Sequence, residues 1–189
     1  MSWETELKMR VASHDPVREK LHELRAALVG KFLEINEIFD RPDGALRRRG
    51  VGLRIRSTRP HQVGGDDLTI LTVKGPRLPG VVKSREEVEF PVPSAETASR
   101  ALNLLGFVRV LRYQKRRESW RLGECRVELD EPPHIGLFVE IEGPDEGTIF
   151  AMRRTLGLDD AEPVAESYVH MLSAYCADHG ITDRVVELV

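Results

Sequence analysis

Hydrophobic and charged residues alternate one by one along several short stretches of this chain. In the first ten residues, MSWETELKMR, Glu4, Glu6 and Lys8 occupy every second position, with Leu7 and Met9 between them. A β-strand directs successive side chains to opposite faces, whereas a helix would scatter these positions around its axis. The pattern therefore predicts a strand with one charged and one apolar face.

The same alternation recurs in LRIR, LTVKGP, SREEVEF, YQKRRESW, RVELDE and FVEIEG. A sheet face that is only solvated would carry mixed polar residues, without matched charges. Here the charged faces sort into a basic set, Lys8, Arg54, Arg56, Lys74, Arg85, Lys115 and Arg117, and an acidic set, Glu4, Glu6, Glu87, Glu89, Glu128, Asp130, Glu140 and Glu142.

Helical periodicity separates groups of these strands. Asp15-Pro16 and VREKLHELRAALVG predict a helix that ends at Gly30, and a second helix is expected from the N-cap Ser94 to Gly106. Their expected inward residues are Val17, Leu21, Leu24 and Leu28 in the first, and Ala98, Ala101, Leu102 and Leu105 in the second. DEGTIFAMRRTLG and PVAESYVHMLSAYCADHG predict further helices, LRRRGVGLRIRS a strand, and HQVGGDD a hairpin tip.

Many short strands with few helices predict an α+β fold built on a closed antiparallel β-barrel of about eight strands, with helices packed outside. In such a barrel the apolar strand faces meet the helices and the charged faces line the lumen. The length of 189 residues fits a single domain over residues 1–189.

Composition narrows the class of protein. The 28 basic and 31 acidic residues give a net charge of −3, which argues against a nucleic-acid surface. Cys125 and Cys176 show no metal or redox spacing, and the sequence has neither a signal-peptide pattern nor an apolar run long enough to cross a membrane. We expect a reduced, cytoplasmic protein without a membrane or nucleic-acid partner.

A confined lumen with many like charges requires counter-charges. A polyphosphate with divalent cations would supply them, since guanidinium and ammonium groups bind phosphate oxygens and carboxylates bind Mg²⁺ or Mn²⁺. The alternation therefore predicts a tunnel for a metal-bound polyphosphate.

The N-terminal E-x-E-x-K (Glu4, Glu6, Lys8) resembles the signature of the CYTH domain family, also called triphosphate tunnel metalloenzymes. The resemblance continues in family order through LRIR, TVKGP, SREEVEF, KRR, VELD, FVEIEG and SYVHML, and so covers almost the whole chain. The family includes class IV adenylyl cyclases, thiamine triphosphatases and inorganic tripolyphosphatases.

The resemblance implies roles for the two charge sets. Triphosphate binding falls to Lys8, Arg54, Arg56, Lys74, Arg85 and Arg117, with Lys115 either in this set or capping the tunnel. Metal binding falls to Glu4, Glu6, Glu140 and Glu142, assisted by Asp130 and Glu128, while Glu87 and Glu89 bind a second metal or orient basic neighbours. Lys8 is also the candidate catalytic residue, because a lysine among cations can act as a base; simple phosphate binding is the alternative.

The same tunnel supports two reactions. Attack of water on the terminal phosphorus of tripolyphosphate, thiamine triphosphate or a nucleoside triphosphate makes a triphosphatase, which we favour. Attack of the ribose 3′-hydroxyl of ATP makes an adenylyl cyclase. A binding module for polyphosphate or nucleotides, or a protein-binding barrel with a structural charge network, remains a different class. Relatives include dimers and monomers, so either a monomer or a homodimer is expected.

Other residues carry weaker predictions. Phe39, in EINEIFDRPDGALRRRG, either packs in the core, which we favour, or stacks on a ring at the tunnel entrance. Arg47, Arg48 and Arg49 either attract an anion to this entrance or form a charged hairpin edge. Ser167-Tyr168 matches a family element, although Tyr168, Met171 and Leu172 could equally form a packing stripe. The histidines show no metal spacing, the cysteines no nucleophile pattern, and GVG at residues 50–52 no phosphate loop.

Overall fold

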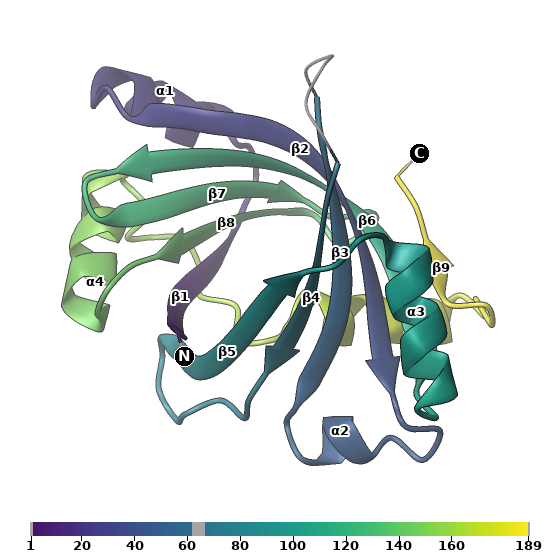
Figure 1. Cartoon of the computed structure of the whole chain (residues 1–189). Coiled ribbons are helices and arrows are strands. Elements are labelled where there is room, and N and C mark those ends of the chain that lie inside the picture. Colours follow the sequence, from purple (N-terminus) through teal and green to yellow (C-terminus); the bar gives the residue numbers. More distant parts are fainter. Residues whose placement is uncertain (1, 62–66, 189) are drawn as a thin grey trace.

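A closed antiparallel β-barrel forms the centre of the molecule (Figure 1). The structure is a computed structural model and describes residues 2–61 and 67–188. Within them the strands are β1 (Ser2–Val11), β2 (Ala27–Asp40), β3 (Gly52–Pro60), β4 (Leu68–Lys74), β5 (Lys83–Pro91), β6 (Val108–Leu122), β7 (Cys125–Glu131), β8 (Leu137–Glu142) and β9 (Val185–Val186).

The strands pair in the order β2-β3-β4-β5-β1-β8-β7-β6, and β2 also pairs with β6, which closes the wall. All of these pairings are antiparallel, and the short β9 adds a parallel pairing to β6. Closure leaves the eight strands of this ring, as far as the chain is described, with two neighbours each. The predicted α+β barrel is confirmed.

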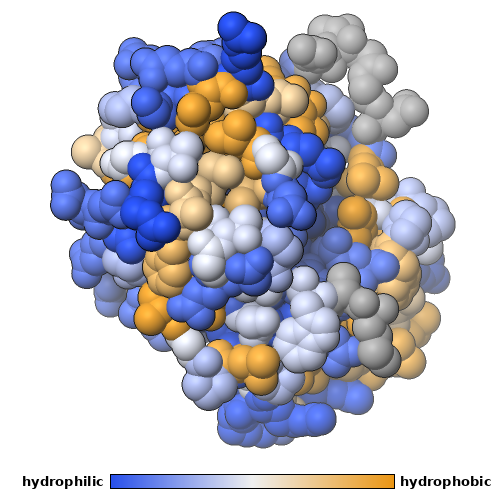
Figure 2. All heavy atoms as spheres, turned by 90° about the vertical axis from the view of Figure 1, so that its left-hand side faces the viewer, coloured by the Kyte–Doolittle hydropathy of each residue, from blue (hydrophilic) through white to orange (hydrophobic). Residues whose placement is uncertain are grey.

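The helices of the described chain are α1 (Asp15–Glu23), α2 (Ala45–Arg48), α3 (Ala95–Leu104), α4 (Glu146–Thr155) and α5 (Tyr168–Asp178). Of these, α1, α3 and α4 pack on the outside of the wall. Leu21 of α1 and Ile149 of α4 are fully buried in one apolar cluster with Leu7 and Ile141 from the strands. On the face of the molecule where α1 and α4 lie, hydrophilic side chains surround smaller groups of hydrophobic ones (Figure 2). The apolar face of these strands is therefore buried against the helices.

α5 lies differently, because it contacts residues on the lumen side of the strands. Tyr168 and Leu172 share an apolar cluster with Tyr113 of β6 and Phe138 of β8. Phe138 alternates with Val139, whose side chain packs in the outer cluster, so Phe138 points inward. α5 thus closes part of one end of the barrel.

The first predicted helix was too long. α1 ends at Glu23, and Arg25 turns the chain with a left-handed φ of 55°, so that β2 begins at Ala27. Leu28 pairs with Trp120 of β6 and is 47 % exposed rather than inward. Gly30 lies within β2, where a Cβ atom would stand 2.6 Å from Cζ of Phe32. Close approach of this ring, not a helix end, accounts for the glycine.

Other elements of the structure also differ from their predicted ranges. Ser94 caps α3 as expected, by accepting from the Thr97 N–H, but the helix ends at Leu104 and both Ala101 and Leu105 are exposed. The first half of LRRRGVGLRIRS forms α2 instead of a strand. The predicted tip HQVGGDD lies between the antiparallel β3 and β4, and its residues 62–66 fall outside the described residues.

Candidate functional site

The lumen of the barrel holds a cavity of about 790 Å³ whose walls carry both predicted charge sets. Every predicted site residue lines this cavity except Asp130, which is fully buried behind it. These lining residues are Glu4, Glu6, Lys8, Arg54, Arg56, Lys74, Arg85, Glu87, Glu89, Lys115, Arg117, Glu128, Glu140 and Glu142. The alternation in the sequence therefore places the charged side chains as predicted, on one continuous inner surface.

On β1, Glu4 is held between two basic side chains. Its carboxylate lies 2.8 and 2.9 Å from Lys74 Nζ and 3.0 Å from Arg85 Nε. Burial raises the pKa of Glu4, but the charges of Lys74 and Arg85 outweigh it and hold this pKa well below its usual range. Glu4 is therefore ionised and already has cationic partners.

Glu6, two residues further along β1, has the opposite balance. Burial and the like charges of Glu140 and Glu4 raise its pKa, although Lys83 lies 3.6 Å away. The strand register sets Glu6 opposite Glu142 and Lys8 opposite Glu140. Carboxylates of β1 and β8 thus gather closely enough to repel one another.

Lys8 is almost fully buried beside these carboxylates. Its Nζ donates to the Glu166 carbonyl oxygen and lies 4.2 Å from the centre of the Tyr168 ring. Burial and the charge of Lys83 lower the pKa of Lys8 to about 7. An amine with this pKa is partly neutral near pH 7, as a general base must be.

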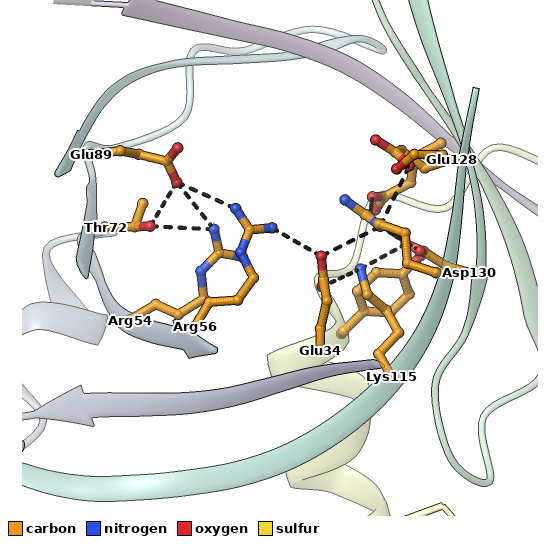
Figure 3. A network of polar contacts seen from close by, with 12 residues as sticks. Glu34, Arg54, Arg56, Thr72, Glu89, Lys115, Glu128 and Asp130 are labelled. Carbon is orange, nitrogen blue, oxygen red and sulfur yellow. Dashed lines mark hydrogen bonds and ion pairs between the residues drawn. The ribbon is translucent and has the colours of Figure 1, made fainter. Parts of the chain in front are cut away.

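A second centre of charge lies on β7 and β6, two and three strands along the wall from β1 (Figure 3). Asp130 accepts from Arg117 at 2.7 and 2.6 Å, from Lys115 at 3.0 Å and from the Tyr168 hydroxyl at 2.9 Å. Arg117 also donates to Glu140 at 2.6 Å. Tyr168 therefore packs in an apolar cluster, as the packing-stripe alternative predicted, and it also contacts the charged network, which the sequence did not predict.

Glu34 of β2 joins this centre and was missed from the sequence. It lies 3.2 Å from Lys115 Nζ and accepts from Arg56 at 3.3 Å. The stretch FLEINEIFD has the same alternation as the other strands, and extending the test to it would have placed Glu34 on the inner face. Five further basic residues that the prediction omitted also line the cavity: Arg41, Arg77, Lys83, Arg126 and Arg184.

On the wall of β3, β4 and β5, Arg54 and Arg56 of β3 lie beside Thr72 and Glu89 (Figure 3). Arg54 and Arg56 both lie 3.5 Å from the Glu89 carboxylate, and Thr72 donates to it at 2.7 Å. Burial raises the pKa of Glu87 to about 7, with Glu4 adding to the rise and Lys74, 2.9 Å away, opposing it. Glu87 and Glu89 thus contact basic side chains, as the predicted orienting role requires. Their other predicted role, binding of a second metal, stays a prediction.

One end of the cavity is bordered by the loop that contains α2. Asp40 orders this loop by accepting from the backbone N–H groups of Leu46 at 2.8 Å and Arg47 at 3.1 Å. Arg47 lines the cavity, whereas Arg48 is paired with Asp43 at 2.8 Å. Phe39 is buried in the cluster beneath α3, which confirms the interpretation as a core residue.

The carboxylates of β1 and β8 are of the ligand type that divalent cations such as Mg²⁺ and Mn²⁺ bind. Glu4, Glu6, Glu140 and Glu142 offer hard oxygen ligands, and a cation would relieve the repulsion that raises the pKa of Glu6. As arranged, however, Glu4 and Glu140 contact basic side chains, and no three His, Cys, Asp or Glu side chains of the described residues form a ready metal cluster. A metal would have to replace these ion pairs.

The histidines and cysteines lie apart from this cavity. His14 Nε2 lies 3.0 Å from the Phe138 carbonyl oxygen, and the ring of His22 packs edge-on against Trp120. Cys125 and Cys176 are buried free thiols. Among the described residues none of these side chains lines the charged lumen.

The fold and the cavity together define a closed antiparallel barrel whose lumen is lined by acidic and basic side chains. The chain belongs to the CYTH domain family, whose model matches residues 2–168. None of the helices in the described part of the chain is long and apolar enough to cross a bilayer.

Particular relatives agree with this membership. A candidate adenylate cyclase of Methanocaldococcus jannaschii is 28 % identical over 139 residues, which cover 74 % of this chain and 75 % of the relative. The PH1819 protein of Pyrococcus horikoshii is 26 % identical, with a TM-score of 0.77 over 91 % of this chain and 99 % of that one. A Hippeastrum protein, described as a candidate adenylyl cyclase with dominant triphosphatase activity, shares the fold at 19 % identity, with a TM-score of 0.69 over 91 % of this chain and 96 % of that one.

Proposed function

We propose that the chain is a divalent-metal-dependent triphosphatase that binds its substrate in the lumen. The observation that carries this proposal is the convergence of basic side chains from β1, β3, β4, β5 and β6 on one cavity that also holds the carboxylates of β1 and β8. Phosphoryl transfer depends mainly on positioning and on charge neutralisation, and this wall provides both. The basic set would bind the triphosphate: Lys8, Arg54, Arg56, Lys74, Arg85, Lys115 and Arg117.

Glu4, Glu6, Glu140 and Glu142 would hold Mg²⁺ or Mn²⁺, with Glu128 and Asp130 in support. A metal bound by these carboxylates would supply charge neutralisation at the phosphates and activation of the attacking oxygen. The substrate phosphates would then take over Lys74 and Arg85 from Glu4, so that no charge is left without a partner. Lys8 would accept the proton of the attacking water, for which a pKa of about 7 is suited.

Adenylyl cyclase activity is the second candidate, because the cavity extends beyond the charged set. Ile38, Val110, Tyr113 and Val169 also line it, and these apolar side chains would accommodate an organic group attached to the triphosphate. The name of the M. jannaschii relative points the same way. In this reaction the ribose hydroxyl replaces water as the nucleophile.

The test is to incubate the protein with Mg²⁺ or Mn²⁺ and, in turn, tripolyphosphate, thiamine triphosphate and ATP, and to resolve the products. Orthophosphate release supports the triphosphatase and ranks its substrates, whereas cyclic AMP with pyrophosphate supports the cyclase. Absence of any metal-dependent product would contradict both and favour a binding module. Glu4→Gln and Glu142→Gln should abolish turnover with the circular dichroism spectrum unchanged; full activity in either variant would contradict the metal assignment.

A further inference from the structure

Glu34 lies on the inner face of the barrel among three cations from two neighbouring strands. Its Oε1 is 3.3 Å from Arg56 Nη1 and 3.9 Å from Arg117 Nε, and its Oε2 is 3.2 Å from Lys115 Nζ. The residue is only 4 % exposed. Although burial opposes ionisation, Lys115, Arg117 and Arg56 hold the pKa of Glu34 well below its usual range. Glu34 is therefore held in its ionised form at the junction of β2, β3 and β6.

The bonds of Glu34 are poor compared with those of its neighbour Asp130. Asp130 accepts four hydrogen bonds of 2.6 to 3.0 Å, including two from Arg117 in a fork. Glu34 accepts one, of 3.3 Å, and its Oε2 accepts none from the described residues despite the nearby ammonium group. Charge-assisted hydrogen bonds are normally 2.7 to 2.9 Å long. The charges of Arg56, Lys115 and Arg117 are thus balanced by Glu34, but Glu34 accepts few of the hydrogen bonds that these cations could donate to an anion at this position.

A phosphate group would serve these cations better. It offers several oxygens and more negative charge than one carboxylate, so it can complete the short bonds that Glu34 leaves unmade. Arg56 could exchange partners readily, because it is already shared between Glu34 and Glu89, 3.5 Å away (Figure 3). Arg117 would keep its orientation through Asp130 during such an exchange.

We propose that Glu34 is a resident counter-anion, which keeps Arg56, Lys115 and Arg117 in place before substrate binds and yields them to a phosphate group of the substrate. This inference rests on the proposed function of the lumen as a triphosphate site. Glu34 is a positioning residue, since it acts through the cations and needs no contact with the reacting atoms. It also repels the incoming anion, and so it weakens binding and promotes release of the phosphate product.

The experiment compares Glu34→Gln with Glu37→Gln. Glu37 lies on the outer face of the same strand, where it binds Arg109 at 3.1 Å and Ser99 at 3.0 Å, so its replacement removes the same charge outside the lumen. Binding of tripolyphosphate is measured by calorimetry in EDTA, without metal or turnover. We expect a Kd about tenfold lower for Glu34→Gln than for the wild type, and no change for Glu37→Gln.

An unchanged or weaker affinity in Glu34→Gln, or no binding by any of the three proteins, would overturn the proposal. If Glu34→Gln folds poorly, the increase in Tm on adding tripolyphosphate replaces calorimetry, and it should be larger than in the wild type. With metal present, KM and kcat should both fall in Glu34→Gln, because product leaves more slowly; a merely structural role would lower kcat without lowering KM. Absence of wild-type turnover together with tighter binding by Glu34→Gln would reject the proposed reaction but keep this role of Glu34.

Discussion

The hydroxyl of Tyr168 donates to Asp130 Oδ2 across 2.9 Å, and this bond joins the first residue of α5 to a fully buried carboxylate of the lumen. Hydrogen bonds to charged groups contribute about 1.5 to 3 kcal/mol. We expect Tyr168→Phe to lower the free energy of unfolding by about 2 kcal/mol, measured by urea denaturation.

Tyr175→Phe is the matched control in the same helix. Its ring stacks between His134 and His179, and its hydroxyl makes no hydrogen bond within the described residues. The stability of this variant should match that of the wild type within about 0.5 kcal/mol. Equal losses in the two variants would show that the Asp130 bond contributes nothing specific.

The lowered pKa of Lys8 predicts a particular pH profile. If Lys8 is the base, its neutral form is required, so kcat/KM should rise with pH and level off above a pKa of about 7. Lys8→Arg keeps the charge but cannot lose its proton, and we expect turnover to fall by about 100-fold and the rise near pH 7 to disappear. A wild-type profile that declines above pH 7 would instead assign Lys8 to phosphate binding in its charged form.

Glu140 predicts a loss of stability in acid. Burial raises its pKa, but Arg117, Lys115 and Lys8 more than compensate and lower it to about 2. Because the folded pKa lies below the ordinary value of 4.5, the stabilisation is complete above that value and is lost as the pH falls toward 2. The unfolding free energies of wild type and Glu140→Gln, measured between pH 6 and pH 2, should therefore converge in acid. Parallel curves would contradict this role; Glu23→Gln, on the exposed end of α1, is the control.

Two adjacent arginines of β6, Arg116 and Arg117, should differ sharply in their contribution to the free energy of unfolding. Arg117 is partly buried, with 13 % of its side chain exposed, and lies among Asp130, Glu140 and Glu34, whereas Arg116 forms an exposed pair with Glu131 at 3.2 Å. Arg117→Met leaves buried carboxylates without their cation and should cost about 3 to 5 kcal/mol. Arg116→Met should cost less than about 1 kcal/mol. Thermal and urea unfolding check both values, and similar losses would show that burial does not set the strength of these pairs.

The alternation of charged and apolar residues was sufficient to predict most of the side chains that line the lumen. A strand buried on one side and charged on the other fixes which side each residue faces, so Glu4, Lys8, Arg54 and Glu140 could be placed before their partners were known. The helix boundaries were harder to predict from the sequence. Leu24 and Leu28 fit a helical stripe, but the pairing of β2 with β6 recruits residues from Ala27 onward, and such tertiary contacts override local periodicity.

Partner choice could not be read from the pattern. The sequence separates acids from bases, yet it does not show that Glu4 binds Lys74 and Arg85 or that Asp130 receives Tyr168. These contacts depend on the register between strands and on where α5 crosses the barrel. Glu34 was overlooked because the alternation test stopped short of β2, and only the closed wall shows its three cations together.

Closure of the barrel also determines when the tunnel can form during synthesis. Ala27 of β2 pairs with Arg121 of β6, and Lys8 of β1 pairs with Glu140 of β8, so the wall joins segments that are far apart in the chain. Such non-local pairing is slow, because loop closure costs entropy before the contacts repay it. β1, which is synthesised before the other strands of the barrel, must therefore wait for β8, and a nascent chain that ends before β8 has no complete site.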